Sequence, residues 1–192
     1  PVDAPGQQWL DRLYRHVFQK EVLHIPYHPY DFEDPYTPPF SPYLLKEYNK
    51  SWFLVAFNHK RERIETLALD RIQQVEASCV TFYRSQAFDG QQYFRDIIGL
   101  TIPDEGKVEE VLIRLSPGQA PYLATKPLHS TQELLGKSED GWLFRFRLIP
   151  NFELESQLLA LGERVEVLAP ASLRAHIKKR IEQTRELYKD LK

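Results

Sequence analysis

Cysteine is nearly absent from this chain, and methionine is absent altogether. The single cysteine, Cys79, excludes an internal disulfide framework and fits a reducing compartment such as the cytoplasm. Because it precedes Val80 at an apolar strand end, we expect Cys79 to be a small buried apolar residue. A chain that lacks methionine and begins at Pro1 is expected to be a fragment or a processed product.

Long apolar runs and a strong charge of one sign are also missing. No segment approaches the roughly 20 apolar residues that cross a bilayer, and no signal-peptide pattern opens the chain, so no membrane association is expected. The net charge of −2 excludes nonspecific coating of DNA, because no overall basic field is present to release counterions. Hydrophobic residues make up 42%, enough for a buried core, so any anion binding requires a local basic cluster.

The signatures of catalysis, cofactor binding and metal binding are missing as well. The glycines are scattered singly, with neither a glycine-rich phosphate loop nor a Gly-x-Ser-x-Gly motif, so no cofactor is expected. His24 and His28 would suit a metal on a helix, but Pro26 and Pro29 exclude a helix there. On a strand the two histidines would lie about 13 Å apart, so no metal site is expected. A hydrolase that uses His24 or His129 is therefore the weakest functional hypothesis.

Residues 1–80 are expected to form one domain, a helix followed by a small β-barrel. Trp9, Leu13 and Val17 recur at helical spacing, which predicts a helix over residues 6–19. Short strands joined by tight turns predict the barrel, and a proline-rich loop over residues 28–42 interrupts them. The expected strands cover residues 21–27, 43–47, 51–58, 64–69 and 73–77, with a tight turn at 70–72.

Residues 90–192 are expected to form a second domain, with the boundary within residues 79–90. The order of elements is β-α-β-β-α-β, which is the order of a ferredoxin-like unit. Asn151 is expected to cap the second of these helices. An amphipathic last helix with Pro170 near its first position follows. The expected strands cover residues 108–115, 130–135, 142–148 and 164–168, and the earlier helices cover 93–98 and 117–126.

An aromatic strand beside a basic turn is the most informative feature of the chain. Aromatic faces stack on bases, and basic side chains neutralise phosphates. Phe53 and Phe57 are expected in the core, which leaves Trp52 against the first helix or against a ligand. Tyr27 and Tyr43 are better pocket candidates, because a phenol can both stack and donate a hydrogen bond.

The basic residues near these strands form the other half of the candidate site. Arg61, like Lys50 and Lys60, lies near a turn and fits a solvated face as well as an anion site. For Arg71, a structural pairing with Asp70 and a phosphate-binding role both stay open. The predicted ligand-binding residues are Tyr27, Tyr43, Lys46, Trp52, His59, Arg61, Arg63 and Arg71.

Several ordered motifs resemble the WYL domain, a family named for a Trp-Tyr-Leu strand. They are SPYLLKEY at residues 41–48, WFLV at 52–55 and LALDRI at 67–72. Later motifs resemble the extension that often follows WYL domains in bacterial regulators. They are PLHSTQ at 127–132, NFEL at 151–154, LLALG at 158–162 and VEVLAP at 165–170.

The resemblance implies an α+β protein in which an Sm-like, SH3-type barrel precedes a ferredoxin-like extension. It also implies a dimeric bacterial transcriptional regulator with a winged helix-turn-helix domain for duplex DNA, which this chain lacks, and a barrel that senses an anionic ligand. Two residues depart from the pattern: Phe53 replaces the middle tyrosine of the naming motif, and Glu65 stands where many members have arginine. Because a carboxylate repels phosphate, Arg63 on the same strand face, or Arg71, would have to replace that arginine.

The leading hypothesis is a sensing and dimerisation region of a cytoplasmic, homodimeric transcriptional regulator. Its effector would be a nucleotide or single-stranded nucleic acid. The alternative is a purely structural dimerisation module that has no ligand site, which Phe53 and Glu65 favour.

Overall fold

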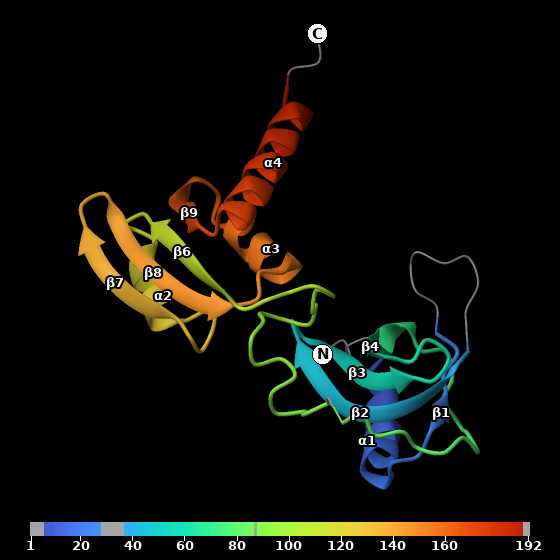
Figure 1. Cartoon of the computed structure of the whole chain (residues 1–192). Coiled ribbons are helices and arrows are strands. Elements are labelled where there is room, and N and C mark those ends of the chain that lie inside the picture. The colour runs from blue at the N-terminus through green and yellow to red at the C-terminus, as the bar shows by residue number, and fades with distance from the viewer. Residues whose placement is uncertain (1–5, 28–36, 87, 190–192) are drawn as a thin grey trace. The chain divides into compact units, whose positions relative to one another are not determined.

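The computed structural model describes residues 6–27, 37–86 and 88–189. The chain divides into two compact units, Pro1–Tyr93 and Phe94–Lys192 (Figure 1). Each unit combines helices with an antiparallel sheet and has its own buried core, which confirms the predicted α+β class. Among the described residues, no helix is both long enough and apolar enough to cross a membrane.

The first unit combines one α-helix with a five-stranded sheet in the order β4-β3-β2-β1-β5. All neighbouring strands in it are antiparallel. The predicted strand at residues 51–58 is confirmed at both ends. The elements are η1 (Gln7–Trp9), α1 (Leu10–Gln19), β1 (Leu23–His24), β2 (Pro39–Tyr48), β3 (Ser51–Asn58), β4 (Arg63–Ala68), η2 (Leu69–Arg71) and β5 (Glu76–Ala77).

The core of the first unit lies on the opposite face of β3 from the one predicted. Leu54 and Ala56 are fully buried in one cluster with Leu13 of α1. Alternation therefore directs Phe53 and Phe57 to the other face, and the prediction that they form the core is wrong. Both faces of β3 are apolar, and α1 covers the face that carries the even-numbered residues.

Three shorter predictions in the first unit also change. β2 begins at Pro39, inside the predicted loop, since a strand tolerates proline at its first residue; residues 28–36 of that loop lie outside the described residues. The predicted strand at 21–27 is reduced to β1 and an isolated bridge between Tyr27 and Ile72. Cys79 is exposed rather than buried, because it follows the end of β5.

The second unit has a four-stranded sheet in the order β7-β8-β6-β9. The predicted element order is confirmed, although β7 lies further along the chain than expected. The predicted helix at 93–98 is wrong, because this segment forms turns and its Asp96 carbonyl accepts the Ile149 N–H instead. The elements are β6 (Glu109–Leu115), α2 (Ala120–Thr125), β7 (Glu133–Ser138), β8 (Gly141–Leu148), α3 (Phe152–Ala160), η3 (Gly162–Arg164), β9 (Val165–Ala169) and α4 (Ala171–Leu187).

The core of the second unit lies between its sheet and its helices. Phe144 and Phe146 of β8 are fully buried together with Leu158 of α3 and Leu173 of α4. Asn151 caps α3 as predicted, because its side chain accepts a hydrogen bond from the Leu154 backbone.

Candidate functional site

Tyr27 and Arg71 are neighbours at the end of β4. The Tyr27 phenol oxygen accepts a hydrogen bond from the Ala68 N–H at 3.2 Å. Burial raises the pKa of Tyr27, although the Ala68 hydrogen bond and the charge and hydrogen bonding of Arg71 act in the opposite direction. The phenol is therefore neutral at pH 7, and Arg71 supplies the positive charge beside it. The structure brings together one predicted aromatic residue and one predicted cation.

Arg61 and Arg63 converge on a single carboxylate. Arg61 Nη1 and Arg63 Nε donate to Glu65 Oε1 at 3.1 and 3.0 Å, and Asn58 Nδ2 donates to Oε2 at 2.8 Å. Burial alone would raise the pKa of Glu65, but the hydrogen bonds from Asn58, Arg63 and Arg61 outweigh it and hold the pKa below its ordinary value. Glu65 is ionised at pH 7 and neutralises part of the positive charge that the sequence placed here.

Asn58 is a site residue that the sequence analysis missed. It is fully buried, and its side-chain oxygen accepts the backbone N–H groups of Lys60 and Arg61. This shapes the turn after β3 and also aims the amide nitrogen at Glu65. A signal was present in the sequence, because Asn58 shares the inward parity of Leu54 and directly precedes the basic turn.

The two basic groups lie at opposite ends of β4. Arg63 and Glu65 pair in register with Asn58 and Ala56 of β3, so the prediction that they share one face is confirmed. The strand rise separates Glu65 from Ala68, where the Tyr27 hydroxyl binds, by about 10 Å. We call Arg61, Arg63, Glu65, Tyr27 and Arg71 the β4 site.

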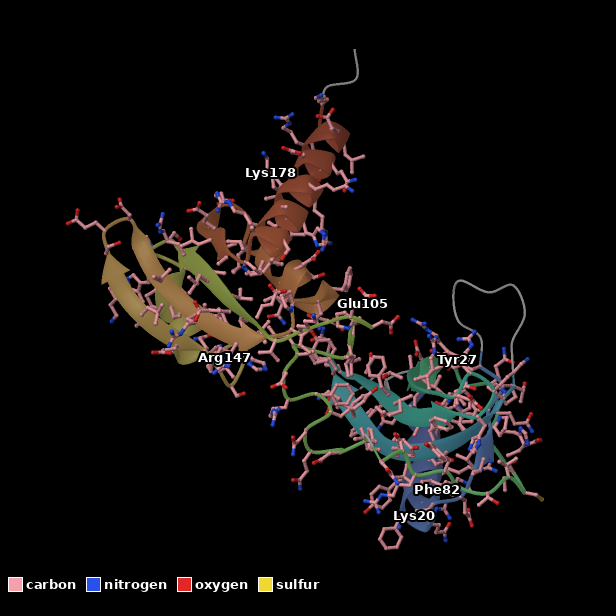
Figure 2. All side chains as sticks on the ribbon, viewed as in Figure 1. Lys20, Tyr27, Phe82, Glu105, Arg147 and Lys178 are labelled. Carbon is pink, nitrogen blue, oxygen red and sulfur yellow. The ribbon has the colours of Figure 1, made fainter. Side chains whose placement is uncertain are left out.

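Tyr43 lies elsewhere in the first unit and fastens a later segment to the sheet. Its hydroxyl donates to the Tyr83 carbonyl at 2.8 Å and accepts the Ser85 N–H at 3.0 Å. Its ring packs at 4.6 Å, centroid to centroid, against Phe88. Figure 2 labels Tyr27 and Phe82, the latter 5.9 Å from the Tyr43 ring, at well separated places. The structure therefore does not bring Tyr43 together with Tyr27.

His59 also helps to hold the segment around Tyr83 against the sheet. Its Nε2 lies 2.8 Å from Ser41 Oγ, which in turn accepts the Tyr83 N–H at 2.9 Å. Burial lowers the pKa of His59, so the ring is neutral at pH 7, and it shares a hydrogen bond with the Ser41 hydroxyl. His59 therefore contributes no charge to an anion site at that pH.

Trp52 and Lys46 lie on opposite faces of the first sheet. Trp52 pairs with Glu47, whereas Lys46 pairs with Phe53, and adjacent pairs of an antiparallel ladder point to opposite sides. Trp52 is half-buried and packs against the core cluster that contains Leu13. The eight predicted residues thus occupy several places, and the β4 site holds four of them.

Removing the Tyr43 hydroxyl tests whether its hydrogen bonds hold the segment at Tyr83 and Ser85 against the sheet. We expect Tyr43→Phe to lower the free energy of unfolding of the first unit by about 1–2 kcal/mol, because the Tyr83 carbonyl and the Ser85 N–H lose their partner. Hydrogen exchange should quicken at Ser85 in particular. Tyr14→Phe is the control, since Tyr14 is 63% exposed on α1. Unchanged exchange at Ser85 in the Tyr43 variant would contradict this assignment.

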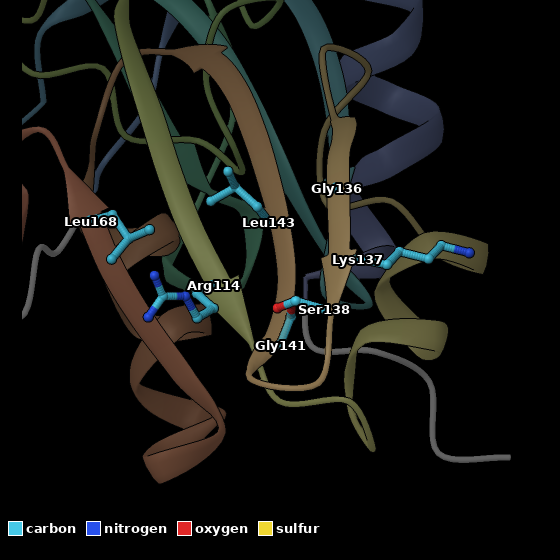
Figure 3. A pocket seen from close by; sticks show the side chains of 7 residues that line it. All are labelled: Arg114, Gly136, Lys137, Ser138, Gly141, Leu143 and Leu168. Carbon is cyan, nitrogen blue, oxygen red and sulfur yellow. The ribbon is translucent and has the colours of Figure 1, made fainter.

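A shallow pocket of about 270 Å³ lies in the second unit (Figure 3). Leu143 and Leu168 line it with apolar surface, and Arg114 lies between them and pairs with Glu166 at 3.3 Å. The Lys137 side chain points away from these two leucines, and its Nζ lies 4.1 Å from the centre of the Trp142 ring. No predicted site residue lines the pocket. The described residues also contain no group of three or more His, Cys, Asp or Glu that could hold a metal.

Comparison with protein families matches one known domain model to each of the two units. The WYL domain model matches residues 8–77, and the WCX domain model matches residues 107–184. The chain contains a WYL domain and a WCX domain. The WYL match includes the whole β4 site, whereas the shallow pocket belongs to the WCX domain.

Two solved structures can be aligned with this chain. A CRISPR Cas-related protein is similar over 95% of this chain and 52% of its own, with a TM-score of 0.57 and 10% identity. Proteasome accessory factor B/C of Arthrobacter aurescens aligns over 99% of this chain and 28% of its own, with a TM-score of 0.40 and 18% identity. This chain therefore spans about half of the first protein and less than a third of the second. A comparison with curated proteins gave no match.

Proposed function

We propose that the WYL domain of this chain binds an anionic, base-containing ligand, either a nucleotide or a short single-stranded nucleic acid. Arg71 carries this proposal, because its guanidinium lies beside the Tyr27 phenol at the end of β4 and is a positioned cation for a phosphate. The Tyr27 ring itself is 7% exposed and packs in the core of the first unit, so it supports Arg71 rather than stacks on a base. Arg61 and Arg63 add positive charge at the other end of the same strand. A ligand with a base and a phosphate could therefore contact both groups.

The strand orders support the finer fold assignment that accompanies this proposal. The sheet order β7-β8-β6-β9 fits a ferredoxin-like WCX domain. Along the chain, a helix follows the first strand of this unit, β6, and the third, β8, as in that fold. A helix followed by the order β4-β3-β2-β1-β5 fits an Sm-like WYL domain.

The proposal extends to the role of the chain in a larger protein. We assign it to the sensing and dimerisation region of a cytoplasmic bacterial transcriptional regulator, which contacts duplex DNA through another domain. Ligand binding can shift the pose of that domain only through different affinities for two poses.

A purely structural dimerisation module is the second candidate function. One observation favours it: Glu65 already pairs with both Arg61 and Arg63 and neutralises part of their charge within the chain. In addition, the polar groups of Tyr43 and His59 form hydrogen bonds within the chain, to the Tyr83 carbonyl and to the Ser41 hydroxyl.

Binding of labelled oligothymidylate of eight nucleotides tests the proposal. We expect fluorescence anisotropy to show binding at 50 mM salt that weakens about 20-fold at 200 mM, for three phosphate contacts. Arg71→Ala should weaken binding and flatten the salt slope, whereas Arg164→Ala, in the other unit, should do neither. Absence of binding by the native chain at 50 mM salt would select the structural alternative.

A further inference from the structure

Glu65 lies deeper than the two arginines that bind it. Its side chain is 12% exposed, whereas Arg61 and Arg63 are 35% and 59% exposed. The guanidinium groups reach solvent while both donate to the same carboxylate oxygen. Two guanidinium groups that converge on one oxygen are an arrangement that binds phosphate or carboxylate well. Here the bound oxygen belongs to the chain itself.

The position of this carboxylate is fixed by the fold. Asn58 is fully buried and is itself held by the Lys60 and Arg61 backbone N–H groups. Its amide then donates to the second oxygen of Glu65 at 2.8 Å. Because both oxygens are engaged, an incoming anion must approach the arginines from the solvent side with Glu65 still behind them.

We propose that Glu65 is an internal anion that occupies the arginine pair of the WYL domain and sets the charge class of its ligand. This inference rests on the proposed function, because it concerns the anion that the β4 site would bind. The repulsion between Glu65 and a ligand grows in proportion to the charge of the ligand. A phosphodiester carries one negative charge, whereas a terminal phosphate monoester carries about 1.5–2 at pH 7. Glu65 therefore favours internal phosphodiester links over terminal phosphates.

The WCX domain supplies a matched control for the removal of one charge. Glu166 also pairs with two arginines, Arg114 at 3.3 Å and Arg174 at 2.9 Å. Glu65→Gln and Glu166→Gln change the net charge equally, and each removes a carboxylate that pairs with two arginines, although Glu166 is 43% exposed and Glu65 is 12% exposed. Only the first change lies in the β4 site.

The experiment measures the dissociation constants of oligothymidylate of eight nucleotides with a 5′-hydroxyl or a 5′-phosphate at 50 mM salt. We expect Glu65→Gln to tighten binding of the 5′-hydroxyl form about tenfold, by loss of a screened repulsion, and the 5′-phosphate form by more. Glu166→Gln should stay within about twofold of the native chain, because its charge lies outside the site. Circular dichroism checks folding, and Glu65→Ala replaces Glu65→Gln if the latter unfolds.

The outcomes separate this inference from the proposed function. If the native chain binds and Glu65→Gln binds no tighter, or Glu166→Gln gains as much, the internal-anion role is overturned and the proposed function stands. If only Glu65→Gln binds, the internal-anion role is supported and the proposed function fails for the native chain. If neither binds, both are overturned.

Discussion

Replacing Leu13 with alanine is expected to lower the free energy of unfolding of the first unit by about 3 kcal/mol. Leu13 is fully buried between α1 and the sheet, in one cluster with Leu54 and Ala56 of β3. Truncation removes apolar contacts and leaves a cavity, and close-packed neighbours relax only partly into such a space. Because α1 is the helix that covers this face of the sheet, we expect the whole first unit to lose stability.

Tryptophan fluorescence during urea unfolding measures this effect. In a Trp142→Phe background only Trp9 and Trp52 remain, and both belong to the first unit. Tyr14→Ala is the control, because Tyr14 lies on the same helix and is 63% exposed; we expect it to change stability by about 0.5 kcal/mol or less. A Leu13→Ala effect as small as that of the control would contradict the placement of the core.

Asn151→Ala is expected to destabilise the second unit by about 3 kcal/mol, the sum of a lost cap and of two carbonyls, one buried and one partly buried, left without this partner. Asn151 is 4% exposed, and its oxygen accepts the Leu154 N–H at 3.0 Å. Its amide nitrogen donates to the Ile98 and Thr101 carbonyls at 2.8 and 2.9 Å. One side chain therefore begins α3 and also holds the segment that precedes β6.

A serine at position 151 separates the two contributions. Asn151→Ser keeps an oxygen that can cap α3 and loses the amide nitrogen, so we expect about half the effect of alanine. A background of Trp9→Phe and Trp52→Phe leaves Trp142 as the reporter, which lies in the second unit. Equal losses for serine and alanine would show that the cap contributes nothing.

Local patterns predicted β3 and the cap of α3 well, because a regular strand or a helix end is specified by nearby residues, whereas the limits of β1, β2, β5 and β7 differed from those predicted. The limits of β3 followed from its alternation and its flanking turn residues, and Asn151 followed from its capping chemistry. The buried face of β3 could not be predicted, since both faces are apolar and the choice depends on α1. The segment that covers Phe57 is distant in sequence, with Tyr83 at 4.3 Å between ring centroids.

The sequence predicted the residue types of the candidate site better than it predicted which of these residues bind one another. Strand parity placed Arg63 and Glu65 on one face correctly. That Glu65 would be held by Asn58 required the register between β3 and β4, which the sequence does not give. The roles of Tyr43 and His59 depend on hydrogen bonds to residues some 40 and 20 positions away, beyond the reach of any local pattern.

The exposure of Cys79 has a practical consequence for solution work on this protein. Because the chain has one cysteine and its side chain reaches solvent, a maleimide dye should attach at a single known position. The same thiol can join two chains through an intermolecular disulfide in air. Measurements of self-association therefore need a reductant, or a Cys79→Ser chain, to distinguish covalent pairs from true dimers.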